Sequence, residues 1–409
     1  MNSEILIGMG LGLESSWEIA KLDFKSINSS NELHIHINFK KGTKFKDEFG
    51  KLCPVHDTIK KQWQHLNFFE HTCYLHCNVP RMKKTNGKVS MVEVPWARKN
   101  SGFTLLFEAF SMAMIENEMP INKVAKFMRV FPQRIWTIFN HWIKKAYSAD
   151  TVKGVTKLGI DETSSKKGHN YVTLGVDLDT SRVFFATEGK GKQTIVDMKE
   201  YLIKKGVEAD EITDISIDLS PSFISGCKAS FPKAQITFDR FHVVKLLNKA
   251  MDTVRKLERK EHDALKGHKY TFLKNPCNLT DKKAVELESL VQIYPVLGEA
   301  YRLKESFNLL WSMSNVTEAT TFFDKWCDHV ILESNMPAFI KFATTAKTHK
   351  KGILSFVKTK ITNGILEGLN CKIQLAKRRA RGYRNIENFK NMIYFLCGKL
   401  KFDYPLYFT

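Results

Sequence analysis

Alternating apolar and polar residues dominate the first hundred positions of the chain. The segment LHIHINF, residues 33–39, is typical. A period of two is the pattern of half-buried strands. We therefore expect residues 1–100 to form a small β-rich module, which includes a stretch rich in cysteine and histidine between positions 53 and 81.

The pattern becomes helical from residue 103 to residue 145, in the segments FTLLFEAFSMAMI, MPINKVAKFMRV and FPQRIWTIFNHWIKK. A short turn joins the last two, which predicts a helix-turn-helix within residues 101–150. Its second helix would carry Gln133, Arg134 and Thr137 near the end that reaches base edges. The alternative is an ordinary helical hairpin, because the apolar stripe of this helix also fits a protein core.

Between residues 157 and 238 the period returns to that of strands, in TKLGID, YVTLGVDL, RVFFATEG, ITDISID and AQITFD, with a helical stretch before the last two. This order is typical of a mixed α/β sheet of the ribonuclease-H type. Residues 241–350 are almost entirely helical and charged. We therefore expect a catalytic domain in two parts, 151–240 and 351–409, which a helical insertion separates.

Three acidic residues stand out in this frame. Asp161 ends the apolar run LGID, Asp218 ends ISID, and Glu367 lies in a helical segment. We expect both aspartates at the C-terminal ends of strands, where α/β sheets bind ligands. If the helix of Glu367 packs across the sheet, the three carboxylates can hold two Mg²⁺ ions for phosphoryl transfer. Each acid could instead be an ordinary strand-end or helix-capping residue.

Other acids compete for the same roles. Asp177 and Asp179 flank a turn and favour a solvated hairpin, while Asp239 follows another apolar strand. We rank all of them below the first three.

The charge of the chain points to a polyanionic partner. Sixty-three Lys and Arg against forty-three Asp and Glu give a formal net charge of +20, which favours nucleic acid. A basic run follows Glu367 and would hold the DNA backbone beside the acids, although such runs are often only a solvated face. Its members are Lys377, Arg378, Arg379, Arg381 and Arg384.

Neither a signal peptide nor a membrane span is indicated, because no apolar run approaches about 18 residues and the first twenty residues have no basic leader. The eight cysteines show no disulfide framework, so reduced thiols are expected. These features predict a cytoplasmic protein.

Three long blocks resemble the catalytic blocks of bacterial insertion-sequence DDE transposases of the ISL-three group. They begin LGIDETSSKKGHNY, SIDLSPSFISGCKA and TNGILEGLNCKIQL, and the resemblance covers residues from about 50 to 400. It implies a retroviral-integrase-like fold, Mg²⁺- or Mn²⁺-dependent cleavage at terminal inverted repeats, and strand transfer into double-stranded target DNA. It also implies at least a homodimer in the synaptic complex, in the bacterial nucleoid.

The resemblance also implies roles for single residues. The family's triad falls on Asp161, Asp218 and Glu367. The block DRFHVVKL begins at Asp239, and its His242 is a candidate for contact with the scissile phosphate or a catalytic water. The alternative is a histidine that only caps or packs at a helix start.

The usual N-terminal zinc finger of this family is broken here. Its first pair of ligands survives as Cys53 and His56, but the second would fall on Lys83 and Asn86, which are not zinc ligands. Cys73, His76 and Cys77 lie on an expected strand, where alternate side chains point to opposite faces. A packed module without zinc is therefore the favoured interpretation.

Two rival functions remain at this stage. A structure-specific nuclease or resolvase would use the same carboxylates without strand transfer. A regulator descended from an inactive element would bind DNA without cutting it.

Overall fold

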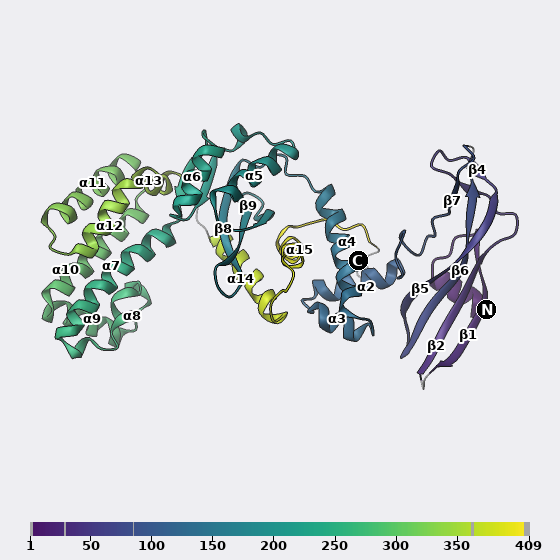
Figure 1. Cartoon of the computed structure of the whole chain (residues 1–409). Helices are drawn as coiled ribbons and strands as arrows, with labels where there is room; N and C mark the ends of the chain where they lie inside the picture. Colours follow the sequence, from purple (N-terminus) through teal and green to yellow (C-terminus); the bar gives the residue numbers. More distant parts are fainter. Residues whose placement is uncertain (1–2, 28–29, 85, 361–363, 405–409) are drawn as a thin grey trace. The chain divides into compact units, whose positions relative to one another are not determined.

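The structure, a computed structural model, describes residues 3–27, 30–84, 86–360 and 364–404 (Figure 1). The chain divides into two compact units, residues 1–148 with 401–409 and residues 149–400. The end of the chain thus returns to the first unit, where Asp403 pairs with Lys145 at 2.6 Å and Tyr404 packs edge-on against Trp142. Among the described helices, none combines the length and apolarity that crossing a bilayer requires.

The first unit begins with a β-sheet in the order β1-β2-β6-β5, with β7 beside β6. β2 runs parallel to β6, whereas β1 and β5 pair antiparallel with their neighbours. Leu33, Ile35 and Leu75 alternate into one core, which explains the period of two. The N-terminal strands expected from the sequence are thus confirmed. The elements are α1 (Ser3–Gly10), β1 (Trp17–Ile27), β2 (Ser30–Phe39), β3 (Phe45–Lys46), β4 (Leu52–Cys53), β5 (Val55–Phe68), β6 (His71–Lys83) and β7 (Val89–Met91).

The helices α2 (Leu105–Glu116), α3 (Ile121–Phe127) and α4 (Pro132–Ala149) complete the first unit. Thr104 caps the N-terminus of α2, where its hydroxyl accepts a hydrogen bond from the Phe107 amide. The stripe on α4 is buried, with Ile135, Ile138 and Phe139 each at most 1% exposed. α3 and α4 therefore meet through a short turn, as the helix-turn-helix prediction requires.

The second unit is built on a sheet in the order β10-β9-β8-β11-β12. β8 (Lys157–Lys166), β9 (Asn170–Asp177) and β10 (Arg182–Glu188) form an antiparallel meander. β11 (Asp214–Ile217) is parallel both to β8 and to β12 (Gln235–Phe238). β8 is therefore the central strand, and the mixed α/β architecture expected from the sequence is confirmed.

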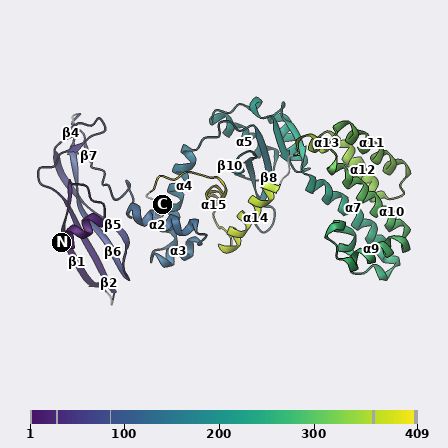
Figure 2. The ribbon, with the colours of Figure 1, turned by 180° about the vertical axis from the view of Figure 1, so that it is seen from behind.

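Helices cover both faces of this sheet (Figures 1 and 2). Met198 of α5 (Lys192–Lys204) lies against Gly175, and Leu366 of α14 (Gly364–Arg379) lies against Gly159. Gly175 pairs with Ile160, the neighbour of Gly159, so the two glycines face opposite sides of the sheet. α6 (Pro221–Ser230) packs beside α5, and α15 (Ile386–Cys397) packs beside α14.

A set of helices, α7 to α13, lies between β12 and α14 in the chain. Phe307, Phe323 and Phe339 lie fully buried in its core. Its last helix packs back onto the sheet edge, where Ser355 and Thr237 share a hydrogen bond of 2.7 Å between their hydroxyls. The helices are α7 (Arg240–Glu261), α8 (Lys269–Leu273), α9 (Asp281–Ile293), α10 (Pro295–Asn308), α11 (Val316–Glu333), α12 (Pro337–Thr348) and α13 (Lys350–Thr359).

Candidate active site

Asp161 lies in the middle of β8, not at its C-terminal end. The expectation of a strand-end position is wrong, because the polar residues 162–166 continue the pairing with β9. A strand is held by its backbone hydrogen bonds, which the loss of apolar side chains does not interrupt. The Asp161 side chain is half-buried, and its Oδ1 accepts a hydrogen bond of 2.7 Å from the Glu162 amide.

The register of α14 along β8 brings the third block of the sequence to Asp161. Asn370 Nδ2 donates to Asp161 Oδ2 at 2.7 Å, and one turn later Gln374 Nε2 donates to Thr163 Oγ1, also at 2.7 Å. Four helical residues rise about 6.0 Å and two strand residues about 6.6 Å, so successive turns of the helix meet every second residue of the strand. Glu367 lies one turn before Asn370, so it is at the end of α14 that lies beside Asp161.

Asp218 and Asp239 directly follow the C-terminal ends of the neighbouring parallel strands β11 and β12, so they lie at the same end of the sheet. Asp218 Oδ1 accepts a hydrogen bond from the Ser220 amide at 3.0 Å. Asp239 is buried and caps α7 through the Phe241 amide, and its Oδ2 lies 3.7 Å from His242 Nε2. The prediction for Asp218 as a strand-end residue thus agrees with the structure.

The pKa shifts of two carboxyl groups show that these acids share one electrostatic environment. The pKa of Asp161 is raised to about 6, chiefly by burial, with a smaller increase from the charges of Asp218 and Asp239. The hydrogen bond from the Glu162 amide and the charge of His242 oppose this increase. Burial also raises the pKa of Asp239, with Glu367 and Asp218 adding to the increase. A raised carboxyl pKa with carboxylate neighbours marks a concentration of negative charge.

Glu367 lies in the first turn of α14 with an exposed side chain. The three residues before this helix, 361–363, are outside the described part of the chain. Within the residues that are described, no three His, Cys, Asp or Glu side chains are close enough together to share a metal ion. The carboxylates therefore form a loose cluster around Asp161.

The basic run after Glu367 divides into two groups. Lys377 is half-buried and donates to the Ser164 carbonyl at 2.5 Å, and burial lowers its pKa. Its ammonium therefore ties α14 to β8. The other members are exposed at the end of α14 and beyond it, namely Arg378, Arg379, Arg381 and Arg384.

The residues predicted to read DNA lie at the N-terminal end of α4. Gln133, Arg134 and Thr137 are exposed. The Arg134 guanidinium lies 5.5 Å from the centre of the Phe103 ring, and the Thr137 hydroxyl donates to the Gln133 carbonyl. All three side chains are accessible to a partner.

The two candidate zinc ligands lie in different environments. Cys53 is buried, and its thiol is within hydrogen-bond reach of Asp47 and the Lys51 carbonyl. His56 is exposed, at an irregular position of β5 where the register with β6 shifts. Cys73 and Cys77 alternate into the core, and burial raises the pKa of each thiol to about 12.

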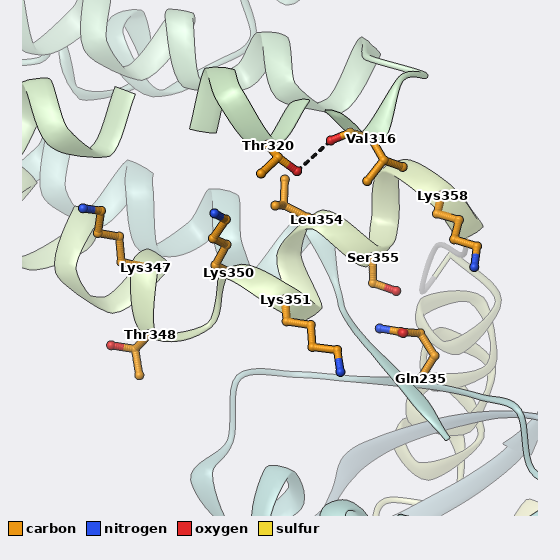
Figure 3. A pocket seen from close by; sticks show the side chains of 10 residues that line it. All are labelled: Gln235, Val316, Thr320, Lys347, Thr348, Lys350, Lys351, Leu354, Ser355 and Lys358. Carbon is orange, nitrogen blue, oxygen red and sulfur yellow. Dashed lines mark hydrogen bonds between the residues drawn. The ribbon is translucent and has the colours of Figure 1, made fainter. Parts of the chain in front are cut away.

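A pocket of about 550 Å³ lies away from the carboxylates (Figure 3). It opens at Gln235, the first residue of β12, whereas Asp239 follows the last. Lys350 on its wall pairs with Asp324 at 2.7 Å. The lining is Gln235, Val316, Thr320, Lys347, Thr348, Lys350, Lys351, Leu354, Ser355 and Lys358.

Sequence reasoning did not single out Asn370, which hydrogen-bonds to Asp161, and it ranked Asp239, whose charge acts on Asp161, below the first three acids. Asn370 follows Glu367 by three residues, a spacing that places both on neighbouring sides of one helical turn. Asp239 follows an apolar strand just as Asp218 does. Both signals were present in the sequence.

Residues 158–393 match a family model described as a transposase, and residues 92–143 match the helix-turn-helix domain of transposase family ISL3. The chain is 27% identical over 355 residues to the transposase for insertion sequence element IS1557 of Mycobacterium tuberculosis strain CDC 1551, with 80% of this chain and 79% of that protein covered. It is also 27% identical over 356 residues to the transposase for element IS1001 of Bordetella parapertussis, with 84% and 86% covered.

The transposase match spans more than half of the chain and contains α7, α14 and all of β8 except its first residue, Lys157. Together with the helix-turn-helix, it defines an enzyme that binds, cleaves and joins DNA. The chain belongs to the ISL3 family of transposases, and its function is DNA transposition. These findings favour neither a resolvase nor a regulator without activity.

Proposed function

We propose that Asp161, Asp218 and Glu367 are the catalytic carboxylates with which this transposase cuts at terminal inverted repeats and joins the ends to target DNA. The observation that supports this most is the hydrogen bond from Asn370 to Asp161, because it ties the helix of Glu367 to the central strand. The strand order, a meander followed by two parallel strands, accords with a ribonuclease-H-like fold.

The donor set fits Mg²⁺ or Mn²⁺. Carboxylate and amide oxygens are the hard ligands that these ions prefer. Asn370 Oδ1 is buried near Asp161 and has no hydrogen-bond partner among the described residues, so it adds a neutral oxygen to the cluster. Asp161, Asp218 and Glu367 would hold the ions once these side chains are drawn closer together than they lie here. When bound, two ions activate the attacking oxygen and stabilise the leaving one.

The histidine at the start of α7 acts beside these carboxylates. His242 lies next to Asp239, whose carboxylate orients the imidazole. In its protonated form the ring donates a hydrogen bond to an oxygen of the scissile phosphate. Asp239 is thus a positioning residue, and His242 contacts the substrate.

Two regions hold the DNA. Gln133, Arg134 and Thr137 contact base edges in the inverted repeat, as side chains at the start of a recognition helix do. The exposed arginines at the end of α14 and beyond it, Arg378, Arg379, Arg381 and Arg384, bind phosphates beside the carboxylates. Lys377 supports α14 instead, because its ammonium is engaged by the strand.

The active complex contains at least two copies of the chain, because two element ends must be held together. Light scattering with and without inverted-repeat DNA tests this. A dimer or larger assembly on DNA is expected, and a single copy on paired ends would contradict it.

The activity is tested with labelled inverted-repeat DNA, a target plasmid and Mg²⁺. Joined products are expected from the wild type, and none from Asp161→Ala or Glu367→Gln. Glu200→Gln, on the exposed side of α5, is the matched control and should retain activity. Cuts without joining would indicate a nuclease, and a mobility shift without cuts would indicate a binding protein.

Metal binding has a readout that is independent of activity. Mn²⁺ at about 100 times its dissociation constant should stabilise the wild-type fold by about 2.7 kcal/mol. The same addition should leave the melting temperature of Asp161→Ala nearly unchanged. Equal stabilisation of both proteins would place the ions elsewhere.

A further inference from the structure

One face of α7 carries a row of lysines that begins at the candidate active site. From His242, residues at offsets of 3, 7, 14 and 18 positions lie within about 60° of one line along the helix, since a helix turns about 100° per residue. These residues are Lys245, Lys249, Lys256 and Lys260. All four are exposed, and we call them the α7 lysine row.

The opposite face of α7 is fixed in the protein core. Val243, Leu247 and Met251 are buried, and this side of the helix packs against α10 and α12. The rotation of α7 is therefore set by packing. As a result, the α7 lysine row faces solvent on the same side as His242, whose charge acts on Asp161 and Asp239.

An acid at the edge of this row is already paired. Asp252 is buried at the edge of the row, and its carboxylate accepts hydrogen bonds from Arg255 and pairs with Lys256 at 3.0 Å. Lys245, Lys249 and Lys260 thus add three charges that this carboxylate does not engage. Repeated like charges on a folded helix cost stability unless a partner of opposite charge covers them.

We infer that the α7 lysine row binds the phosphate backbone of duplex DNA next to the scissile bond, without reading its sequence. The row extends about 27 Å from His242 to Lys260 at 1.5 Å per residue. This length corresponds to about 8 base pairs at 3.4 Å each. Figure 1 shows α7 leading from the sheet into the helical insertion, so DNA on this face lies along the insertion. The inference rests on the proposed function only in placing the scissile phosphate at the carboxylates.

The binding test uses the full chain and a duplex of about 30 base pairs without the inverted repeat. We compare the wild type with the triple variant Lys245→Gln, Lys249→Gln, Lys260→Gln by anisotropy over a range of salt concentrations. The variant should bind at least tenfold more weakly at low salt, and its plot of log K against log salt should be shallower by about 2.7, or 0.9 per lost contact. Lys282→Gln, Lys325→Gln, Lys341→Gln is the matched control, because it removes three exposed lysines from α9, α11 and α12.

Photocrosslinking separates this surface from the helix-turn-helix. A benzoylphenylalanine at position 249 should crosslink to a duplex carrying the inverted-repeat end, within the roughly 8 base pairs next to the scissile bond that the whole α7 lysine row spans. The same group at position 341 should not crosslink there. The inference is overturned if the slopes of variant and wild type agree, if the control triple loses as much affinity, or if position 249 gives no crosslink.

These outcomes are distinct from failure of the proposed function. If the wild type crosslinks from position 249 but joins no ends with Mg²⁺, the catalytic assignment fails and the DNA surface stands. If the wild type joins ends and the triple variant keeps the wild-type salt slope, the surface fails and the catalytic assignment stands.

Discussion

Asn370 on α14 donates a hydrogen bond of 2.7 Å to Asp161 at the centre of β8, although 209 residues separate them in the sequence. This bond is the direct side-chain link between the helix of Glu367 and the strand acid. It fixes the rotation of the Asp161 carboxylate, since the other oxygen is held by the Glu162 amide. The orientation of Asp161 therefore depends on where α14 docks.

Replacing Asn370 by alanine should slow strand transfer while leaving the fold intact. Hydrogen bonds to charged groups contribute about 1.5–3 kcal/mol, so the rate should fall roughly 10- to 100-fold. The Mg²⁺ concentration for half-maximal activity should rise as well. Gln374→Ala is the control, because it removes a similar bond to Thr163 one turn later. Single-turnover kinetics measure both, and equal rates for the two variants would contradict a role for Asn370.

Glu108→Ala should destabilise the first unit strongly. Glu108 is fully buried, and its carboxylate accepts hydrogen bonds from Arg98, Ser101 and the Trp142 indole. Removal leaves these donors unpaired and costs about 3–5 kcal/mol. Glu116→Ala, exposed at the end of α2, should change stability by less than about 0.5 kcal/mol. Chemical denaturation followed by tryptophan fluorescence measures the difference, and a small effect of Glu108→Ala would count against this network.

Low pH should lower the stability of the first unit, because His65 is buried in its neutral form. Burial lowers the pKa of His65 to about 4, and its Nδ1 lies 2.8 Å from the Thr104 hydroxyl. In the unfolded chain the imidazole has a pKa near 6.5, so on acidification the unfolded state takes up a proton before the folded state does. The free energy of unfolding is therefore unaffected by His65 above pH 6.5 and falls as the pH drops from 6.5 toward 4. The loss is about 3 kcal/mol, with little further change below pH 4.

The variant His65→Gln tests this assignment. Its stability should depend less steeply on pH between 6.5 and 4, by about one proton or 1.36 kcal/mol per pH unit. His76, whose pKa burial also lowers to about 4, keeps its own contribution in the variant. Urea unfolding at several pH values measures the slope, and an unchanged slope would mean that His65 does not titrate in this way.

Gly352→Ala should destabilise the second unit, although alanine normally favours a helix over glycine by up to about 1 kcal/mol. A Cβ at Gly352 would come within 2.4 Å of the Phe238 ring on β12. Relieving such a clash typically costs about 1–3 kcal/mol, so overpacking exceeds the gain in propensity. Gly368→Ala on α14, where a Cβ meets nothing within 4 Å, should stabilise instead. Thermal unfolding measures the change in melting temperature of each variant. A change in the same direction for both variants would refute the packing argument.

Local patterns were sufficient to predict several parts of this protein. The period of two located the strands of both sheets, and the helical period located α4 and the insertion, because burial on one face depends on nearby residues. The order of Asp161, Asp218 and Glu367 along strand, strand and helix was also visible. Their catalytic roles stay a prediction until the variants are measured.

Contacts between distant segments were beyond these patterns. The parallel pairing of β2 with β6 and the polar half of β8 depend on backbone bonds to remote partners, which side-chain alternation does not encode. The bond between Asn370 and Asp161 depends on the register of α14 over β8, which arises only when the sheet has formed. Burial of Glu108 likewise needs α4 in place, because Trp142 is one of its donors.

The long separation between β8 and α14 has a consequence for the newly made chain. A ribosome that adds about 5–20 residues per second takes roughly 10–40 seconds to travel the 209 residues from Asp161 to Asn370. During that interval the helix-turn-helix and Asp161 exist without Glu367, and Asp218 joins them after a further 57 residues. A chain that has not yet reached α14 therefore has the DNA-binding helices but lacks the proposed third carboxylate, so we expect it to bind DNA without cutting it.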